Sequence, residues 1–109
     1  MGKKINLNRT ENTKSRVIAE SIRKGVESYL SQNVDIHGFV LVEAVILSQD
    51  LRSAKICILF QDETKDKEIL LTTLNSRKKD VVDSIKKIMT TKYFPKINFI
   101  KGEDEDLVF

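Results

Sequence analysis

The sequence is poor in the residues that form disulfides and metal sites. Among its 109 residues it has one cysteine, Cys57, and one histidine, His37. A disulfide within the chain is therefore excluded, and these two side chains alone supply too few ligands for a structural zinc ion. We expect no metal or cofactor, and the single cysteine fits a reducing, cytoplasmic location.

Long apolar runs are also missing. No run approaches the roughly 20 residues that cross a bilayer, so no membrane partner is expected. Residues 1–16 are basic but have no apolar segment after them, so we do not expect a secretory signal. With 40% hydrophobic and 32% charged residues, the chain is expected to fold as one soluble domain.

Catalytic motifs are scarce. The glycine-rich phosphate loops of nucleotide-binding proteins do not occur. Ser48, Asp50 and His37 have the side chains of a hydrolase triad, but their spacing matches no known motif, and turn formation accounts for the first two. Cys57 within a strand is typical of a small buried hydrophobic residue. A small enzyme is therefore the least favoured hypothesis, and we expect no catalytic residue.

The charge is unevenly distributed along the chain. The net charge is +3, yet residues 103–106 are Glu-Asp-Glu-Asp, so residues 1–102 carry 19 basic and 12 acidic side chains, a net charge of +7. We interpret residues 1–12 as a flexible basic arm and residues 103–109 as an acidic tail. A basic body indicates a polyanionic partner, with ordinary surface lysines as the alternative interpretation.

The first half of the chain predicts a helix and a hairpin. Residues 13–32 place apolar side chains at helical spacing, and Gly25 beside this stripe would let another element approach closely. Residues 39–47 and 53–61 read as strands joined by a loop in which Ser48 and Asp50 bind backbone N–H groups. Both faces of the first strand are largely apolar, which predicts a central strand.

The second half predicts two helical segments and a last strand. Apolar spacing runs from 69 to 74 and from 81 to 89, with a kink near Asn75–Ser76, where either residue would cap the second segment. Pro95 then precedes a strand over 96–101. The order α-β-β-α-(kink)-α-β predicts an α+β sandwich, a three-stranded sheet with helices packed on one face.

Basic residues gather at the kink, further along the second helical segment and near the start of the chain. Cations at a helix start oppose the helix dipole, so their placement there favours phosphate binding over stability. A solvated lysine-rich face is the alternative. The candidate RNA-binding residues are Arg77, Lys78 and Lys79 at the kink, Lys86, Lys87 and Lys92 further along, and Arg9, Lys14 and Arg16 near the start.

The stretch VILSQDLRSAKICILF, from Val45 to Phe60, resembles the signature of the bacterial ribosome-binding factor A family. That signature is a strand ending in Val-x-x-Ser-x-Asp-Leu-x-x-Ala-Lys. The matching residues are Val45, Ser48, Asp50, Leu51, Ala54 and Lys55, with Pro95, Ile97 and Phe99 in the last strand and Arg16-Val17 in the first helix. The resemblance covers about residues 9–102, nearly the whole chain.

The resemblance implies a type II K-homology (KH)-like fold, with residues 13–102 as the RNA-binding domain. It also implies a non-enzymatic factor that binds the free small (30S) ribosomal subunit, assists late maturation of its 16S rRNA and supports growth in the cold. We expect it to act as a monomer. RNA contacts are expected along the second helix pair and the basic arm.

Two departures from the family pattern leave an alternative open. The family has Ala-x-Gly at the kink, whereas this chain has Arg77, Lys78 and Lys79 there. Without glycine the backbone cannot approach a nucleic acid as closely, so side-chain charge would have to replace it. Glu-Asp-Glu-Asp after Gly102 also blurs the acidic position that the family has after its last strand. The alternative is a KH-like protein-interaction module that does not bind RNA.

Overall fold

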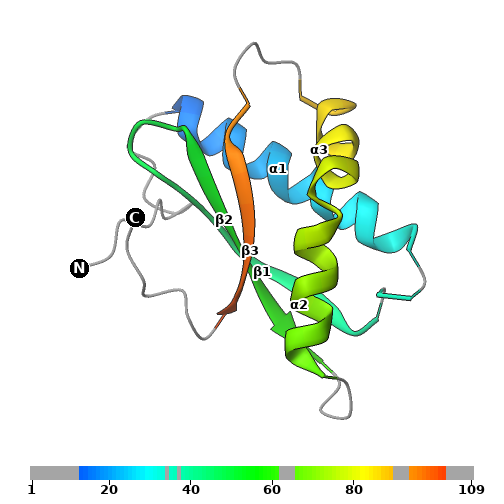
Figure 1. Cartoon of the computed structure of the whole chain (residues 1–109). Coiled ribbons are helices and arrows are strands. Elements are labelled where there is room, and N and C mark those ends of the chain that lie inside the picture. Colours follow the sequence, from blue (N-terminus) through cyan, green and yellow to red (C-terminus); the bar gives the residue numbers. More distant parts are fainter. Residues whose placement is uncertain (1–12, 34, 37, 62–65, 90–93, 103–109) are drawn as a thin grey trace.

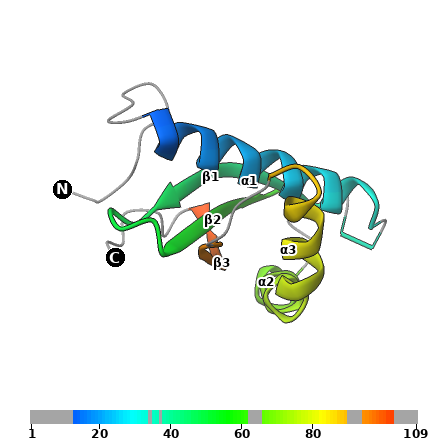
Figure 2. The same cartoon turned by 90° about the horizontal axis from the view of Figure 1, so that it is seen from above.

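The computed structural model describes residues 13–33, 35–36, 38–61, 66–89 and 94–102. The elements are α1 (Thr13–Ser31), β1 (Val40–Leu47), β2 (Ser53–Phe60), α2 (Lys67–Ser76), α3 (Lys78–Lys86) and β3 (Lys96–Lys101). The strands form one sheet in the order β1-β2-β3, with β1 antiparallel and β3 parallel to β2 (Figures 1 and 2). The predicted element order, including the kink, is confirmed.

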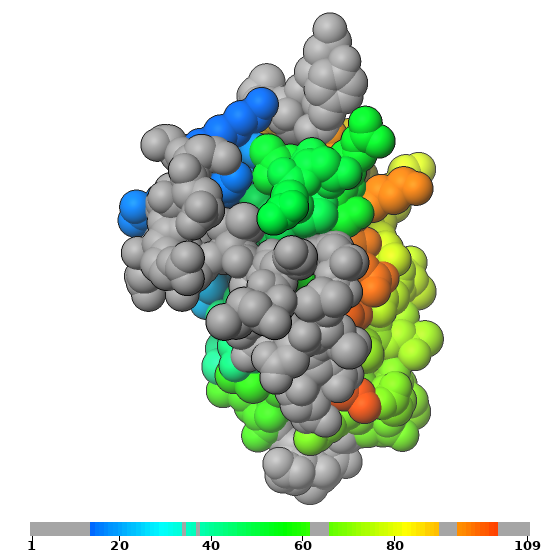
Figure 3. All heavy atoms as spheres, turned by 90° about the vertical axis from the view of Figure 1, so that its left-hand side faces the viewer, coloured from blue at the N-terminus to red at the C-terminus, as the bar shows by residue number. Residues whose placement is uncertain are grey.

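The strand over 39–47 was expected to be central, and this is wrong. β1 lies at one edge of the sheet and β2 is the central strand. A bulge between Val42 and Ala44 shifts the register, so Val42 and Val45 both face the core. Because of the bulge, core-facing and outward-facing side chains do not alternate regularly along β1. We call the sheet surface turned away from the helices the far face; Figure 3 views this side of the molecule.

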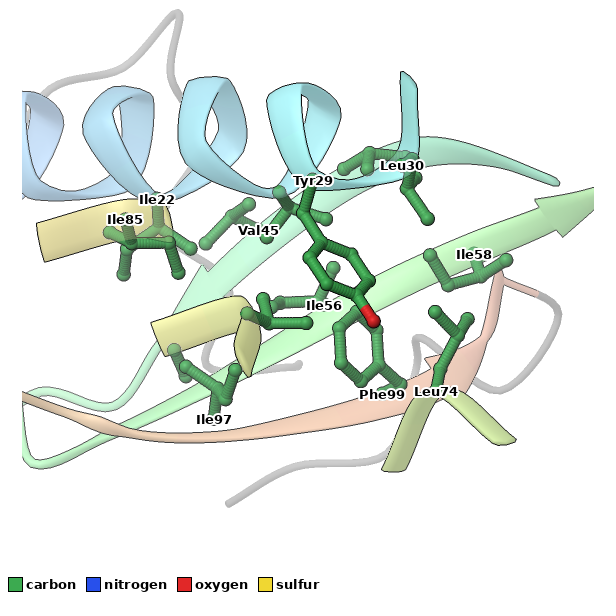
Figure 4. Close-up of a cluster of buried hydrophobic side chains, with 14 of the residues drawn as sticks. Ile22, Tyr29, Leu30, Val45, Ile56, Ile58, Leu74, Ile85, Ile97 and Phe99 are labelled. Atoms are coloured by element: carbon green, nitrogen blue, oxygen red, sulfur yellow. The ribbon is translucent and has the colours of Figure 1, made fainter. Parts of the chain in front are cut away.

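All three helices and one face of every strand contribute to the core. Phe99 of β3 is among its largest fully buried side chains. Figure 4 shows Tyr29 of α1 pointing toward Phe99, with Leu74 of α2 beside it. β3 therefore completes the core, although it is the last strand in the sequence.

Helices α1 and α3 cross at Gly25, where the sequence predicts the close approach of another element. A methyl group on Gly25 would lie 2.6 Å from the Cα atom of Ile85. That distance is shorter than van der Waals contact, so no other residue fits there without movement of a helix backbone. The missing side chain thus sets the spacing of the helix pair.

The β1–β2 turn has the predicted hydrogen bonds. The Ser48 hydroxyl donates to Oδ1 of Asp50 (2.7 Å) and accepts from the backbone N–H of Ser53 (3.1 Å). Asp50 also accepts from the N–H of Arg52 (3.0 Å). Leu51 adopts a positive φ of 63°, which the sequence did not indicate; its side chain packs against the core. Packing of this side chain offsets the strain of the left-handed conformation.

Candidate nucleic-acid interface

The α2–α3 kink is fixed to the edge of β3 by Asn75. Its amide donates to the carbonyl of Phe99 (3.1 Å) and accepts from the Phe99 N–H (2.9 Å). Asn75 therefore pairs with β3 as a neighbouring peptide group would, and it is not the cap that the sequence suggested. The N-cap of α3 is Arg77, whose side chain makes no capping hydrogen bond.

The kink does not need glycine. Arg77 lies between the two helices at φ −107° and ψ 19°, a conformation open to ordinary residues. The Ala-x-Gly pattern is therefore dispensable for the path of this backbone. Without glycine, side chains cover the backbone at the kink. Any nucleic acid bound here therefore contacts side chains before it can contact the backbone.

Arg77 itself contributes to the stability of the fold. Its Nη2 atom lies 2.8 Å from Oδ2 of Asp35, in the turn after α1. This hydrogen bond is the main reason that the pKa of Asp35 lies below its usual value, and the same bond together with Tyr29 raises the pKa of Arg77. Arg77 thus ties the kink to the end of α1, and part of its charge is neutralised.

Replacing Asp35 with Asn is expected to lower stability at neutral pH by a small amount. The lowered pKa means that the Asp35–Arg77 pair stabilises the fold above the unfolded pKa of about 3.9 and loses this effect as pH falls through the folded value. Urea unfolding at neutral pH and near pH 2 would test this. The difference from wild type should vanish in acid; an equal difference at both pH values contradicts the pairing. Asp83→Asn, on the exposed side of α3, is the control.

Lys78 also contacts β3. Its Nζ atom donates to Oδ1 of Asn98 (2.8 Å), whose side chain is exposed at the sheet edge. Together with Asn75, this bond holds the start of α3 against the strand. Because Asn98 is neutral, this hydrogen bond does not offset the positive charge of Lys78.

Three other predicted residues are exposed cations on α3 and just after it, namely Lys79, Lys86 and Lys87. In the part of the chain that the structure describes, their side chains make no ion pair or hydrogen bond. Lys79 and Lys86 are seven residues apart and share a helix face. Asp80 and Asp83 are exposed among them, so this surface is mixed in charge rather than uniformly basic.

The remaining predicted cations lie elsewhere. Lys14 and Arg16 are exposed at the start of α1, and Arg16 pairs with Glu20 at 3.2 Å. A helix of 19 residues is about 28 Å long, so these two lie far from the Asp35 turn that Arg77 contacts. Arg9 and Lys92 lie outside the described residues. The structure therefore separates Lys14 and Arg16 from the predicted cations at the kink.

Sequence reasoning missed Arg52 and Lys96. The backbone N–H of Lys96 donates to the carbonyl of Arg52 (2.9 Å), and both side chains are exposed. They lie where β2 and β3 begin. Further along the two strands, Lys55 lies opposite Asn98 in the parallel register. Only the parallel pairing of β2 with β3 brings these cations together, and no local pattern reveals that pairing. The basic surface around β3 is thus larger than predicted.

The family model of ribosome-binding factor A matches residues 8–107, nearly the whole chain. The chain belongs to the ribosome-binding factor A family. A search of curated proteins found no match.

Solved structures have the same fold. A Thermotoga maritima protein described as a candidate ribosome-binding factor A has a TM-score of 0.70 and 22% identity, covering 91% of this chain and 98% of that one. The crystal structure of ribosome-binding factor A from Thermus thermophilus has a TM-score of 0.66 and 15% identity, covering 80% and 94%. A homology model of the Thermus thermophilus factor, fitted into a cryo-electron-microscopy map of its 30S complex, has a TM-score of 0.57 and 15% identity, covering 78% and 87%.

Other kinds of site find little support in the described residues. No group of three or more His, Cys, Asp and Glu side chains is placed there to hold a metal ion. None of the described helices is both long and apolar enough to span a membrane.

Proposed function

We propose that this chain binds free small ribosomal subunits through 16S rRNA and assists the late steps of subunit assembly and rRNA processing. The observation that carries the proposal is the family match over residues 8–107. The fitted 30S complex of the Thermus thermophilus factor supports the same partner. The factor acts as a cytoplasmic monomer without a cofactor and catalyses no reaction.

The rRNA contacts are made by side chains at the kink and along α3. Lys79 and Lys86 on α3 and Lys87 just after it are exposed to solvent, and Lys78 and Lys96 extend this surface along β3. Each cation that meets a phosphate releases a condensed counterion, which favours binding at low salt. Arg77 acts as a positioning residue, because its guanidinium is held by Asp35. Arg9, Lys14, Arg16 and Lys92 supply further contacts from the arm, the start of α1 and the segment before β3.

Co-sedimentation with small subunits, large subunits and assembled ribosomes, at low and high salt, tests the function. We expect binding to free small subunits alone, which weakens steeply as salt rises because phosphate contacts dominate. Equal binding to all three particles would indicate a generic basic protein. No binding to any of them would contradict the proposal.

The alternative is a protein-interaction module that does not bind RNA. The observation in its favour is the paired exposure of Leu41 and Leu59 on the far face. An apolar interface would persist at high salt, and ribonuclease would not release the partner. These two treatments therefore separate the two functions in the same sedimentation assay.

A further inference from the structure

Each outer edge of the sheet receives hydrogen bonds from a helix side chain. At β3, the Asn75 amide pairs with both backbone groups of Phe99. At β1, Arg23 of α1 donates from Nη2 to the carbonyl of Val42 (2.8 Å) and from Nη1 to that of Glu43 (3.4 Å). Unpaired backbone groups at a sheet edge can pair with another chain, and proteins block them with charged side chains and bulges. β1 has both, because Arg23 binds at its bulge.

The register shows which backbone groups of β1 point away from the sheet. In an antiparallel pair, alternate residues direct both backbone groups toward the neighbouring strand, and the residues between them direct theirs away. The carbonyl of Phe39 accepts from the N–H of Gln61, so Leu41 also faces β2, whereas Val40 and Val42 face outward. The bond from α1 to the carbonyl of Val42 agrees with this direction. Val40 and Val42 therefore form the outer edge before the bulge.

The structure has room for another chain beside this edge. Helix α1 lies along β1 (Figure 2), and a hollow between them is lined in part by Leu30, Val40, Leu41 and Gln61. An extended chain that entered this hollow would meet the backbone of Val40. It would then have to displace Arg23 to reach the carbonyl of the next outward residue.

The guanidinium of Arg23 is held in place on its other side as well. Its Nε atom lies 3.5 Å from Oε2 of Glu27, one helical turn further along α1. Hydrogen bonds from a charged donor are stronger than those between neutral groups, so Arg23 is a firm substitute for a neighbouring strand. Arg16 and Glu20 repeat the same spacing on α1, but among the described residues the Arg16 side chain bonds Glu20 alone. The two arginines therefore differ in their contact with the sheet.

We propose that Arg23 is an edge cap, which prevents β1 from pairing with β1 of a second copy of the chain. Two copies related by a two-fold axis near Leu41 would pair Val40 of one copy with Val42 of the other. This pairing needs the carbonyl that Arg23 occupies. The exposed Leu41 side chains would then meet as a cross-strand pair, which favours a second copy as the partner of an uncapped edge. This inference does not depend on ribosome binding.

The variant Arg23→Met tests the cap, because it keeps an apolar stem and removes the donors. We expect its average mass, measured by sedimentation equilibrium, to rise with protein concentration toward twice the monomer mass, whereas wild type stays monomeric. Arg16→Met is the matched control: it makes the same change in charge and breaks the same kind of ion pair on α1. A folded Arg23→Met protein that stays monomeric would overturn the proposal, as would equal association of the control.

Hydrogen exchange identifies the surface through which the variant associates. The amides of Val40 and Val42 should exchange at least about tenfold more slowly in concentrated than in dilute Arg23→Met. Association without this protection would place the contact elsewhere and refute the cap.

A measurement on wild type decides the question if the variant does not fold. The Nη protons of Arg23 should give separate, slowly exchanging nuclear magnetic resonance signals, because two carbonyls hold the guanidinium. Those of the exposed Arg52 should be averaged by rotation. Averaged signals for Arg23 would contradict the proposal.

Discussion

The triple variant Lys79→Glu, Lys86→Glu, Lys87→Glu is expected to bind small ribosomal subunits at least about 100-fold more weakly than wild type near 0.1 M salt. Each phosphate contact contributes nearly one logarithmic unit of affinity at this salt concentration, so the loss of two or three contacts accounts for the effect. The stability of the fold should change little, because all three side chains are exposed. Sedimentation or fluorescence titration with purified subunits measures the affinity. A plot of the logarithm of affinity against the logarithm of salt concentration should have a shallower slope than for wild type.

A matched variant tests whether position or net charge matters. Lys24→Glu, Arg52→Glu, Lys67→Glu changes the net charge equally on α1, the hairpin and the start of α2. We expect a much smaller loss of affinity, limited to long-range attraction and to any contact made by Arg52. If both triple variants lose affinity equally, α3 is not the interface. Arg77 is left out of the test because its variant would also break the Asp35 pair.

Gly25→Ala is expected to destabilise the fold by about 3 kcal/mol, even though alanine is the better helix former by about 1 kcal/mol. The added methyl group would lie 2.6 Å from both Cα and Cγ1 of Ile85. A rotamer change can move Cγ1 but cannot move Cα, so α1 and α3 have to separate. A loss of this size lowers the melting temperature by roughly 15 °C in a domain of this length.

The control for this prediction is Lys24→Ala, the neighbouring exposed position on α1. It should change the melting temperature by only a degree or two, since it adds no contact with α3. Thermal unfolding followed by circular dichroism is sufficient for both variants. A Gly25→Ala protein as stable as wild type would show that the helices can move apart freely, contrary to the close crossing.

Local chemistry could be predicted from the sequence. The Ser48–Asp50 turn, the kink and the close approach at Gly25 each depend on residues a few positions apart, so their patterns can be recognised in the sequence. The family resemblance depended on the same local motif. These features are confirmed by the hydrogen bonds and by the helix crossing.

Long-range pairing could not be predicted. The Arg77–Asp35 pair joins residues 42 positions apart, and Asn75 bonds Phe99 across 24 positions. Helix-capping rules predicted Asn75 or Ser76 as the cap of α3, but Asn75 bonds β3 and the N-cap is Arg77. The bulge in β1 likewise made an edge strand look central. For the candidate site, the sequence identified exposed cations on α3 but gave no sign that Arg77 is engaged by the fold.

The position of β3 at the end of the sequence affects how the protein folds during synthesis. The ribosome synthesises the chain from its first residue, so every helix and the hairpin emerge before Phe99 does. Until β3 arrives, β2 has an open edge and the core lacks one of its largest side chains. Stable folding must therefore wait until residue 101 has left the exit tunnel, and a nascent chain that stalls before β3 would expose a surface prone to aggregation.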